Sequence, residues 1–294
     1  MTILTCFILF LWQLTVFVTA IGIPTKVPGD SSVSVAFFDR IPILRYEDDW
    51  VCVQKPPGIS VHANTVVGRR RTERTLCSLV RKQLGRKVYP VHRLDHRTSG
   101  AILLAFDATT CGILHGQLKR STKEYVALVR GQWKYNTTSV TIDVPLKVNS
   151  TLKEAITEFS FVASSDYNNL PYTLVLCRPL TGRTHQIRRH AYHLGHPILG
   201  DSEHGDSRVN RQWRTERGLN RLALHCLSIQ LMGIQDACLA PLPMDLQCVL
   251  TMDTQLWDTA SQKEPRLNLE AIDERGGSFG RNYKKRQKDN EETQ

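Results

Sequence analysis

Residues 91–100 (VHRLDHRTSG) contain a single carboxylate among cationic side chains. This carboxylate, Asp95, has a His-Arg pair on each side of it. Neighbouring positive charge keeps a carboxylate ionised, and an ionised carboxylate suits a nucleophile better than a proton donor. Asp95 is therefore the candidate reactive group. Taken alone, the segment also fits a structural carboxylate that pairs with Arg93 or Arg97 and closes a turn.

The hydrophobic pattern around this segment predicts the elements that must hold it in place. Apolar residues at helical spacing predict a helix over residues 75–84, with Gly85 at its end. A continuous apolar run predicts a strand over 101–106, and Asp107 is suited to cap a following helix that extends to about Lys119. The other expected elements are strands within 43–53, 124–129, 172–177, 222–224 and 229–231 and a helix over 184–194.

The order of these elements predicts one α+β domain with a leader before it and a tail after it. The leader has no charged residue over 3–22 and includes a small-residue sequence, so a signal peptide, a membrane anchor and a misassigned start codon all fit it. We place the leader in 1–20, a linker or second targeting segment in 21–42, the domain in 43–256 and a polar, basic, disordered tail in 257–294.

Basic residues are in excess, with 38 Lys and Arg against 28 Asp and Glu, which favours a polyanionic partner. Arginine dominates three clusters, in residues 68–87, 178–189 and 208–221. Its planar guanidinium suits bidentate contacts to phosphate. Any one cluster also fits a solvated surface, but three in one domain favour nucleic acid.

No metal centre is predicted from the sequence. The eight cysteines include no C-x-x-C pair, which argues against a zinc ribbon or finger. His190, His193 and His196 are spaced three apart, but the last is rotated about 240° from the first on a helix, so the three do not converge.

Four segments in order resemble the motifs of the RluA-type pseudouridine synthases. They lie in residues 46–62 (with YEDDW, KPPG and VH), 92–100 (HRLDxxTSG), 123–131 (KEYVALVRG) and 180–188 (LTGRTHQIR). The segments 188–190, 196–206 and 210–222 further resemble the TruC branch, which modifies uridine 65 of certain tRNAs. One departure is His96-Arg97, where TruC-type sequences usually have Arg-Pro.

This resemblance implies an isomerase with one pseudouridine-synthase-like domain, in which a mixed, mainly antiparallel sheet is flanked by helices. It implies that Asp95 is the nucleophile, attacking the ribose or the uracil ring. Tyr125 would stack on the target base and help remove its C5 proton, and Arg183 would form a buried salt bridge to Asp95. Arg93 would fill the gap left by the flipped-out nucleotide. We expect further RNA contacts from His92, Arg97, Arg69, Arg70, Arg71, Arg188, Arg189 and Arg211.

The resemblance also implies RNA as the partner of a monomeric enzyme that needs no cofactor or metal, since the reaction has no redox step. We expect tRNA as the substrate, with rRNA as the alternative. A second class is an RNA-binding assembly factor that kept the fold without catalysis, but the presence of Asp95, Tyr125 and Arg183 favours the enzyme. A leader on such an enzyme predicts an organelle that holds RNA, a plastid or mitochondrion, whereas a downstream start codon predicts the cytoplasm.

Overall fold

The computed structural model describes residues 40–62 and 74–269, and the predicted leader, Arg69, Arg70, Arg71 and residues 270–294 of the predicted tail lie outside them. The strands are β1 (Ile43–Tyr46), β2 (Trp50–Lys55), β3 (Tyr89–Pro90), β4 (Ser99–Ala105), β5 (Thr122–Arg130), β6 (Ser139–Asp143), β7 (Leu146–Val148), β8 (Thr151–Lys153), β9 (Ile156–Ser165), β10 (Tyr172–Pro179), β11 (Leu224–Gln230) and β12 (Cys238–Leu239). The helices are α2 (Leu76–Leu84), α3 (Ala108–Leu118), α4 (Gln186–His193), α5 (Ser207–Arg217), α6 (Met244–Thr251) and α7 (Thr254–Lys263), with 3₁₀ turns at Tyr167–Asn169 and Pro265–Asn268.

One ten-stranded sheet organises this part of the chain. Its order is β1-β2-β4-β11-β5-β10-β9-β6, with β3 paired to β4, β12 paired to β11, and the hairpin β7-β8 separate. The pairing of β11 with β4 is parallel, and the other pairings within the sheet are antiparallel. The expected α+β fold with a mixed, mainly antiparallel sheet is confirmed.

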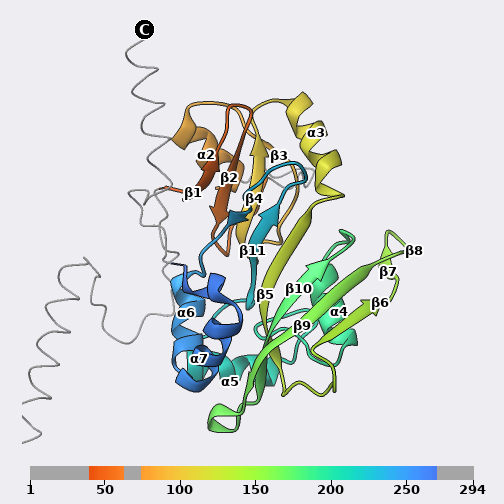
Figure 1. The fold of residues 1–294 in the computed structure, drawn as a ribbon, viewed down its shortest axis with the longest axis vertical. Helices are drawn as coiled ribbons and strands as arrows, with labels where there is room; N and C mark the ends of the chain where they lie inside the picture. The colour runs from red at the N-terminus through yellow and green to blue at the C-terminus, as the bar shows by residue number, and fades with distance from the viewer. Residues whose placement is uncertain (1–39, 63–73, 270–294) are drawn as a thin grey trace, which may run out of the picture. The chain divides into compact units, whose positions relative to one another are not determined.

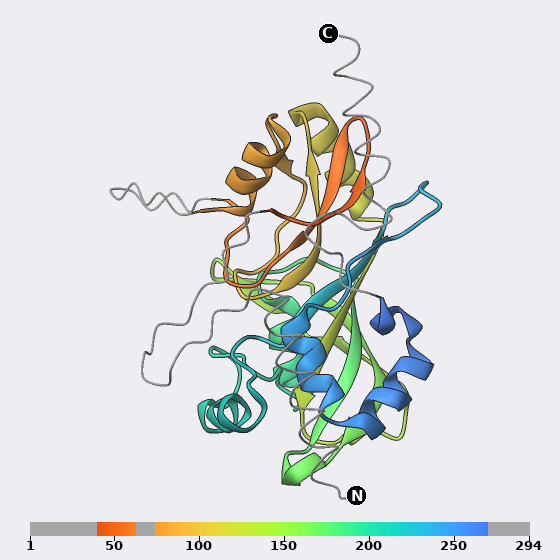
Figure 2. The ribbon, with the colours of Figure 1, turned by 90° about the vertical axis from the view of Figure 1, so that its left-hand side faces the viewer.

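Two groups of elements are joined by the long strands β5 and β11 (Figure 1). Helices α2 and α3 lie beside β1 to β4, while α4 to α7 lie around β5, β9 and β10, and the side view keeps the same division (Figure 2). No helix of the described residues is both long enough and apolar enough to span a lipid bilayer.

Capping residues mark the ends of the two predicted helices α2 and α3. The side chain of Thr75 accepts the N–H of Ser78 at the start of α2, and Gly85 ends that helix in the left-handed conformation. Asp107 caps α3 by accepting the N–H of Thr110 at 2.8 Å. These contacts explain why both helix boundaries were predictable from the sequence.

The predicted pair of short strands in 222–231 is wrong, because β11 runs unbroken through this segment. The polar residues His225 and Ser228 interrupt the apolar pattern, yet both are buried. The ring of His225 lies between two partners, the hydroxyl of Ser99 at 2.8 Å from Nδ1 and the carbonyl of Ala240 at 3.0 Å from Nε2. A polar side chain with both ring nitrogens satisfied can occupy a central strand.

The predicted domain boundaries also need correction. The tail does not begin at residue 257, because α7 packs on β9 and Leu256, Ala260 and Leu267 are core residues. The linker does not extend to residue 42, because Ile41 is buried and its N–H and C=O both bond the side chain of Gln83. The described domain therefore runs from about Ile41 to Leu267.

We expect the stability of the domain to fall in mild acid. Burial lowers the pKa of His225 to about 3, so between pH 6.5 and 3 the unfolded chain binds a proton that the folded chain does not. This group alone should lower the free energy of unfolding by about 2 kcal/mol from pH 7 to pH 5. Urea unfolding at both pH values tests this, with His193→Gln, at an exposed histidine, as the control that should keep the same pH dependence. A flat profile would contradict the burial of neutral His225.

Candidate active site

The candidate nucleophile lies in the loop between β3 and β4. The carbonyl of Asp95 accepts the N–H of Thr98 at 3.1 Å, which closes the turn, and the carboxylate is 28% exposed. The loop then enters β4 at Gly100, whose φ is +116°. A Cβ at this position would lie 2.2 Å from the carbonyl oxygen of Cys226, so glycine is needed for β4 to approach β11. The carboxylate therefore lies at the N-terminal end of a central strand of the sheet and remains open to a ligand.

The cation that faces Asp95 is Arg188, on α4. Its Nη1 lies 3.5 Å from Oδ2 of Asp95, and its side chain is only 5% exposed. Nε and Nη2 of the same guanidinium each donate to Asp201 at 2.8 Å. Arg188 thus uses two donors to fix its own position and directs a third toward the nucleophile.

Asp201 is the anchor of this arrangement. Its side chain is fully buried, and its Oδ1 also accepts the backbone N–H groups of Glu203 and His204 at 2.9 and 3.1 Å. Burial opposes ionisation, but the hydrogen bonds from Arg188 and from these two backbone groups lower the pKa of Asp201. The ionised form of Asp201 that these contacts favour keeps Arg188 in place.

The predicted salt bridge between Arg183 and Asp95 is wrong. Nε of Arg183 donates to the carbonyl of Glu154 at 2.8 Å, at an exposed position. Arg183 precedes α4, whereas Arg188 lies on the helix and is directed into the protein, so the two arginines of one motif have different environments. The ion pair with Asp95 is formed instead by Arg188, which had been predicted to contact RNA. A guanidinium with this burial and these partners is not available to phosphate.

Tyr125 lies on β5, between β10 and β11 in the sheet, and is 7% exposed. Burial and its hydrogen-bond partner Cys226 raise the pKa of Tyr125 well above the usual value, and the charge of Asp95 acts in the same direction. The phenol is therefore neutral at physiological pH and lies within electrostatic range of Asp95. Its stacking on the target base stays a prediction, and a neutral phenol is a weak base.

Lys55 was not singled out from the sequence, although it belongs to the KPPG segment. Its side chain is fully buried, and Nζ donates to the carbonyls of Pro56, Ile59 and His96 at 2.9, 2.9 and 3.1 Å. Burial lowers the pKa of Lys55 to about 7, and the charge of Asp95 opposes that shift. One side chain thus ties the KPPG turn to the residue that follows the nucleophile.

His92 and two arginines of the 208–221 cluster make contacts within the fold. Nε2 of His92 accepts the N–H of Leu103 at 3.2 Å, and burial lowers its pKa to about 3, so His92 is not a cation at neutral pH. Within the 208–221 cluster, Arg217 stacks over the ring of Tyr167 at 4.1 Å. Arg221 is buried and donates to the hydroxyl of Ser99 at 2.7 Å. The clusters therefore overstate the charge available to RNA.

Other predicted contacts remain open to a ligand. Arg93, Arg97 and Arg211 are exposed, and Arg97 donates to the hydroxyl of Ser202 at 3.1 Å beside the site. Arg189 is half-buried, with its Nη1 bonded to the carbonyl of Lys147 at 3.1 Å. Their contacts with RNA stay predictions.

Comparison with known proteins assigns the family. The profile of the RNA pseudouridylate synthases matches residues 49–193, which contain Asp95, Tyr125 and Arg188. The tRNA pseudouridine synthase C of Pasteurella multocida (strain Pm70) is 38% identical over 204 residues, covering 62% of this chain and 82% of that protein. This chain belongs to the RNA pseudouridylate synthase family. Members of this family are isomerases that act on uridines in RNA.

Two further relatives of this pseudouridylate synthase add detail. The ribosomal large subunit pseudouridine synthase C of the same bacterium is also 38% identical over 204 residues, but the match covers 59% of that protein. The structure of human RNA pseudouridylate synthase domain containing 1 superposes with a TM-score of 0.56 at 26% identity, over 74% of this chain and 86% of the human one. The catalytic fold expected from the four motifs is therefore present.

Proposed function

We propose that this pseudouridylate synthase isomerises a uridine of tRNA, with Asp95 as the nucleophile. The observation that carries the proposal is the partly exposed carboxylate of Asp95, which faces a guanidinium of Arg188 that two hydrogen bonds to Asp201 hold in position. An oriented, ionised carboxylate beside a buried aromatic ring suits attack on a flipped-out nucleoside. We propose that the chain acts as a monomer and without a cofactor, because the reaction exchanges no electrons or groups with another molecule.

The chemistry breaks the bond from uracil N1 to ribose C1′ and forms a bond from C5 to C1′. The C5 proton leaves, and N1 gains a proton, so the atoms balance without a co-reactant. While the glycosidic bond is broken, Asp95 is bonded covalently to the ribose or to the uracil ring, and Tyr125 packs against the base. The uridine must leave its stack first, at a cost of a few kcal/mol, which phosphate contacts from exposed arginines offset.

Support for tRNA over rRNA comes from the extent of the two matches. Both Pasteurella relatives are 38% identical, so identity does not separate them. The match covers 82% of the tRNA enzyme and 59% of the rRNA enzyme.

The test is tritium release from RNA labelled at uridine C5. We expect purified protein to release tritium from a tRNA pool and not from rRNA fragments, and pseudouridine mapping in cells with and without the protein to locate the uridine. Release from rRNA alone would assign the alternative substrate. Binding of RNA with no release from either would support the assembly-factor alternative and contradict the proposal.

We expect RNA binding to weaken steeply with salt, by a slope in log K against log [salt] of about −0.7 to −0.9 for each phosphate contact. Changing Arg69, Arg70 and Arg71 together to alanine should flatten this slope, because three cationic groups are lost. The matched control changes the same residues to lysine, which keeps the charge and should keep most of the slope. An unchanged slope in the alanine variant would place the RNA elsewhere. Filter binding at several salt concentrations measures both.

The compartment is a separate proposal. We propose that the leader directs the chain to a plastid or mitochondrion, because the activity needs RNA and the leader resembles a targeting signal such as a signal peptide. Full-length protein tagged at the C-terminus should then localise to an organelle. Finding the tagged protein in the cytoplasm would favour a downstream start codon. Finding it secreted would contradict both the organelle and the downstream start.

A further inference from the structure

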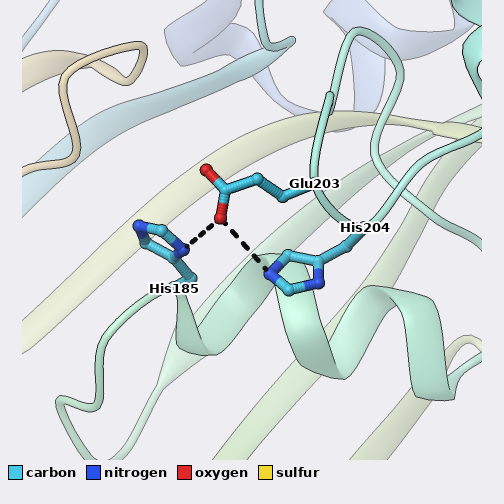
Figure 3. A group of neighbouring side chains, drawn as sticks. All are labelled: His185, Glu203 and His204. Atoms are coloured by element: carbon cyan, nitrogen blue, oxygen red, sulfur yellow. Dashed lines mark ion pairs between the residues drawn. The ribbon is translucent and has the colours of Figure 1, made fainter.

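A group of three metal-ligating side chains lies beside Asp95 and has no part in the proposed chemistry. His185 precedes α4, while Glu203 and His204 lie in the loop between α4 and α5, and their side chains point toward one another (Figure 3). Nδ1 of His185 lies 3.1 Å from Oε2 of Glu203, and Nε2 of His204 lies 4.0 Å from the same oxygen. The three ligand atoms all lie within 4.8 Å of one another.

This separation is close to that of a metal site. Nitrogen and oxygen ligands about 2.0–2.1 Å from a tetrahedral zinc ion lie about 3.3 Å from each other. The pair of His185 and Glu203 already matches this distance. Glu203 is 55% exposed, so rotation of its side chain can shorten the distance to His204 without moving the backbone. Two imidazoles and one carboxylate form the donor set of a borderline-soft cation such as Zn²⁺.

The conformation of the chain supplies independent support. Among the described residues, Nε2 of His204 is one of few buried side-chain atoms without a hydrogen-bond partner, and it is directed into this group. A buried ring nitrogen with no partner costs free energy that a metal ion would recover. His185 has a φ of +52°, in the left-handed region that non-glycine residues adopt rarely.

The charges around the group also favour a divalent cation. Asp95, Asp201 and Glu203 contribute three negative charges, and Arg188, which contacts all three, contributes one positive charge. This ion-pair network is therefore net negative by two when the imidazoles are neutral. A Zn²⁺ ion would neutralise it, and the 28% and 27% exposure of His185 and His204 leaves a path for the ion.

We propose that His185, Glu203 and His204 bind a Zn²⁺ ion at the edge of the catalytic site and that the bound ion inhibits the enzyme. With Nδ1 of His185 on the metal, its Nε2 keeps the proton and faces Oδ1 of Asp95, 3.8 Å away. A metal-bound histidine usually donates its other N–H to a carboxylate, which strengthens both contacts. Here that carboxylate is the nucleophile, so zinc binding would hold Asp95 in a hydrogen bond. The inhibition, but not the binding, rests on the proposed function.

The binding test uses Zn²⁺ and the full chain, stripped with EDTA and then dialysed free of it. Competition with a chromophoric chelator should give one site, and His204→Gln should weaken that site by at least about 10-fold, since loss of a supporting partner alone costs as much. His193→Gln removes an exposed imidazole of α4 and should leave the affinity unchanged. Co²⁺ should give a visible ligand-field band with the parent chain that His204→Gln loses. Equal zinc affinity for the parent chain and His204→Gln would overturn the site.

The inhibition test measures tritium release against free Zn²⁺. The activity of the parent should fall as the site fills and return on addition of EDTA. The activity of His204→Gln without metal should match the parent. This variant should need at least about 10-fold more Zn²⁺ for the same inhibition. Equal inhibition of both proteins would show that zinc acts through the RNA or another site, and this result would overturn the inhibitory role, as would filling of the site without loss of activity. A chain that binds zinc through His204 but releases no tritium would reject the proposed function and leave the metal site standing.

Discussion

Replacing Asp95 with asparagine should abolish pseudouridine formation. The amide keeps the size of the side chain but cannot form the covalent bond, and loss of a nucleophile typically slows an enzyme by at least about 10³-fold. The folded state should change little, because the ion pair of Arg188 with Asp201 does not involve Asp95. Single-turnover tritium release measures the rate, and filter binding should show RNA affinity within a few-fold of the parent.

The control for this variant is His96→Gln, at the exposed residue that follows Asp95. Its side chain is not assigned to the chemistry, and its carbonyl, which accepts from Lys55, remains in place. Activity should therefore survive. Measurable turnover by Asp95→Asn would assign the nucleophile to another group and remove the central residue of the proposed mechanism.

Changing Arg188 to methionine should lower stability and reaction rate far more than changing Arg183 to methionine. Arg188→Met leaves the fully buried carboxylate of Asp201 without its ion pair, which should cost about 3–5 kcal/mol of stability. It also removes the guanidinium that faces Asp95, and misplacement of a reactive group by about 1 Å can slow a reaction about 100-fold. Arg183→Met loses one exposed hydrogen bond and should cost under about 1 kcal/mol. Urea unfolding and single-turnover rates measure both effects.

Because Arg188→Met could fail to fold, Arg188→Lys provides a second measurement. Lysine keeps the charge but not the planar pair of donors that Asp201 accepts, so stability and rate should fall between those of the parent and the methionine variant. If Arg183→Met proved as damaging as Arg188→Met, the assignment of the electrostatic role to Arg188 would be rejected.

The parts of the fold that were predictable are those with local signals. Apolar periodicity and capping residues locate α2 and α3, and a continuous buried run locates β4. Helix α5 was missed because only Trp213 and Arg217 of its eleven residues are buried, which leaves no apolar stripe to detect. The buried His225 similarly hid the continuity of β11.

The motifs identify the residues of the site that lie within them, but not the contacts that these residues make in the folded chain. The motif at 180–188 contains two arginines, and the choice between them depends on where α4 begins, which capping patterns do not reveal because His185 makes no side-chain cap. Asp201 and Glu203 meet Arg188 across thirteen or more residues of sequence, through a loop whose path depends on tertiary packing. The three carbonyls around Lys55 are likewise set by backbone geometry that residue types do not encode.

The position of β11 in the sheet has a consequence for how this enzyme is made. Asp95 precedes β4 and Tyr125 lies on β5, and these two strands are not neighbours, because β11 lies between them. Ser99 and His225, which pair across β4 and β11, are 126 residues apart in sequence. Contacts of such long range close late and slow folding. A nascent chain that ends before residue 224 thus carries all four motifs but no active site. The growing polypeptide can act on RNA only after β11, its last central strand, has been synthesised.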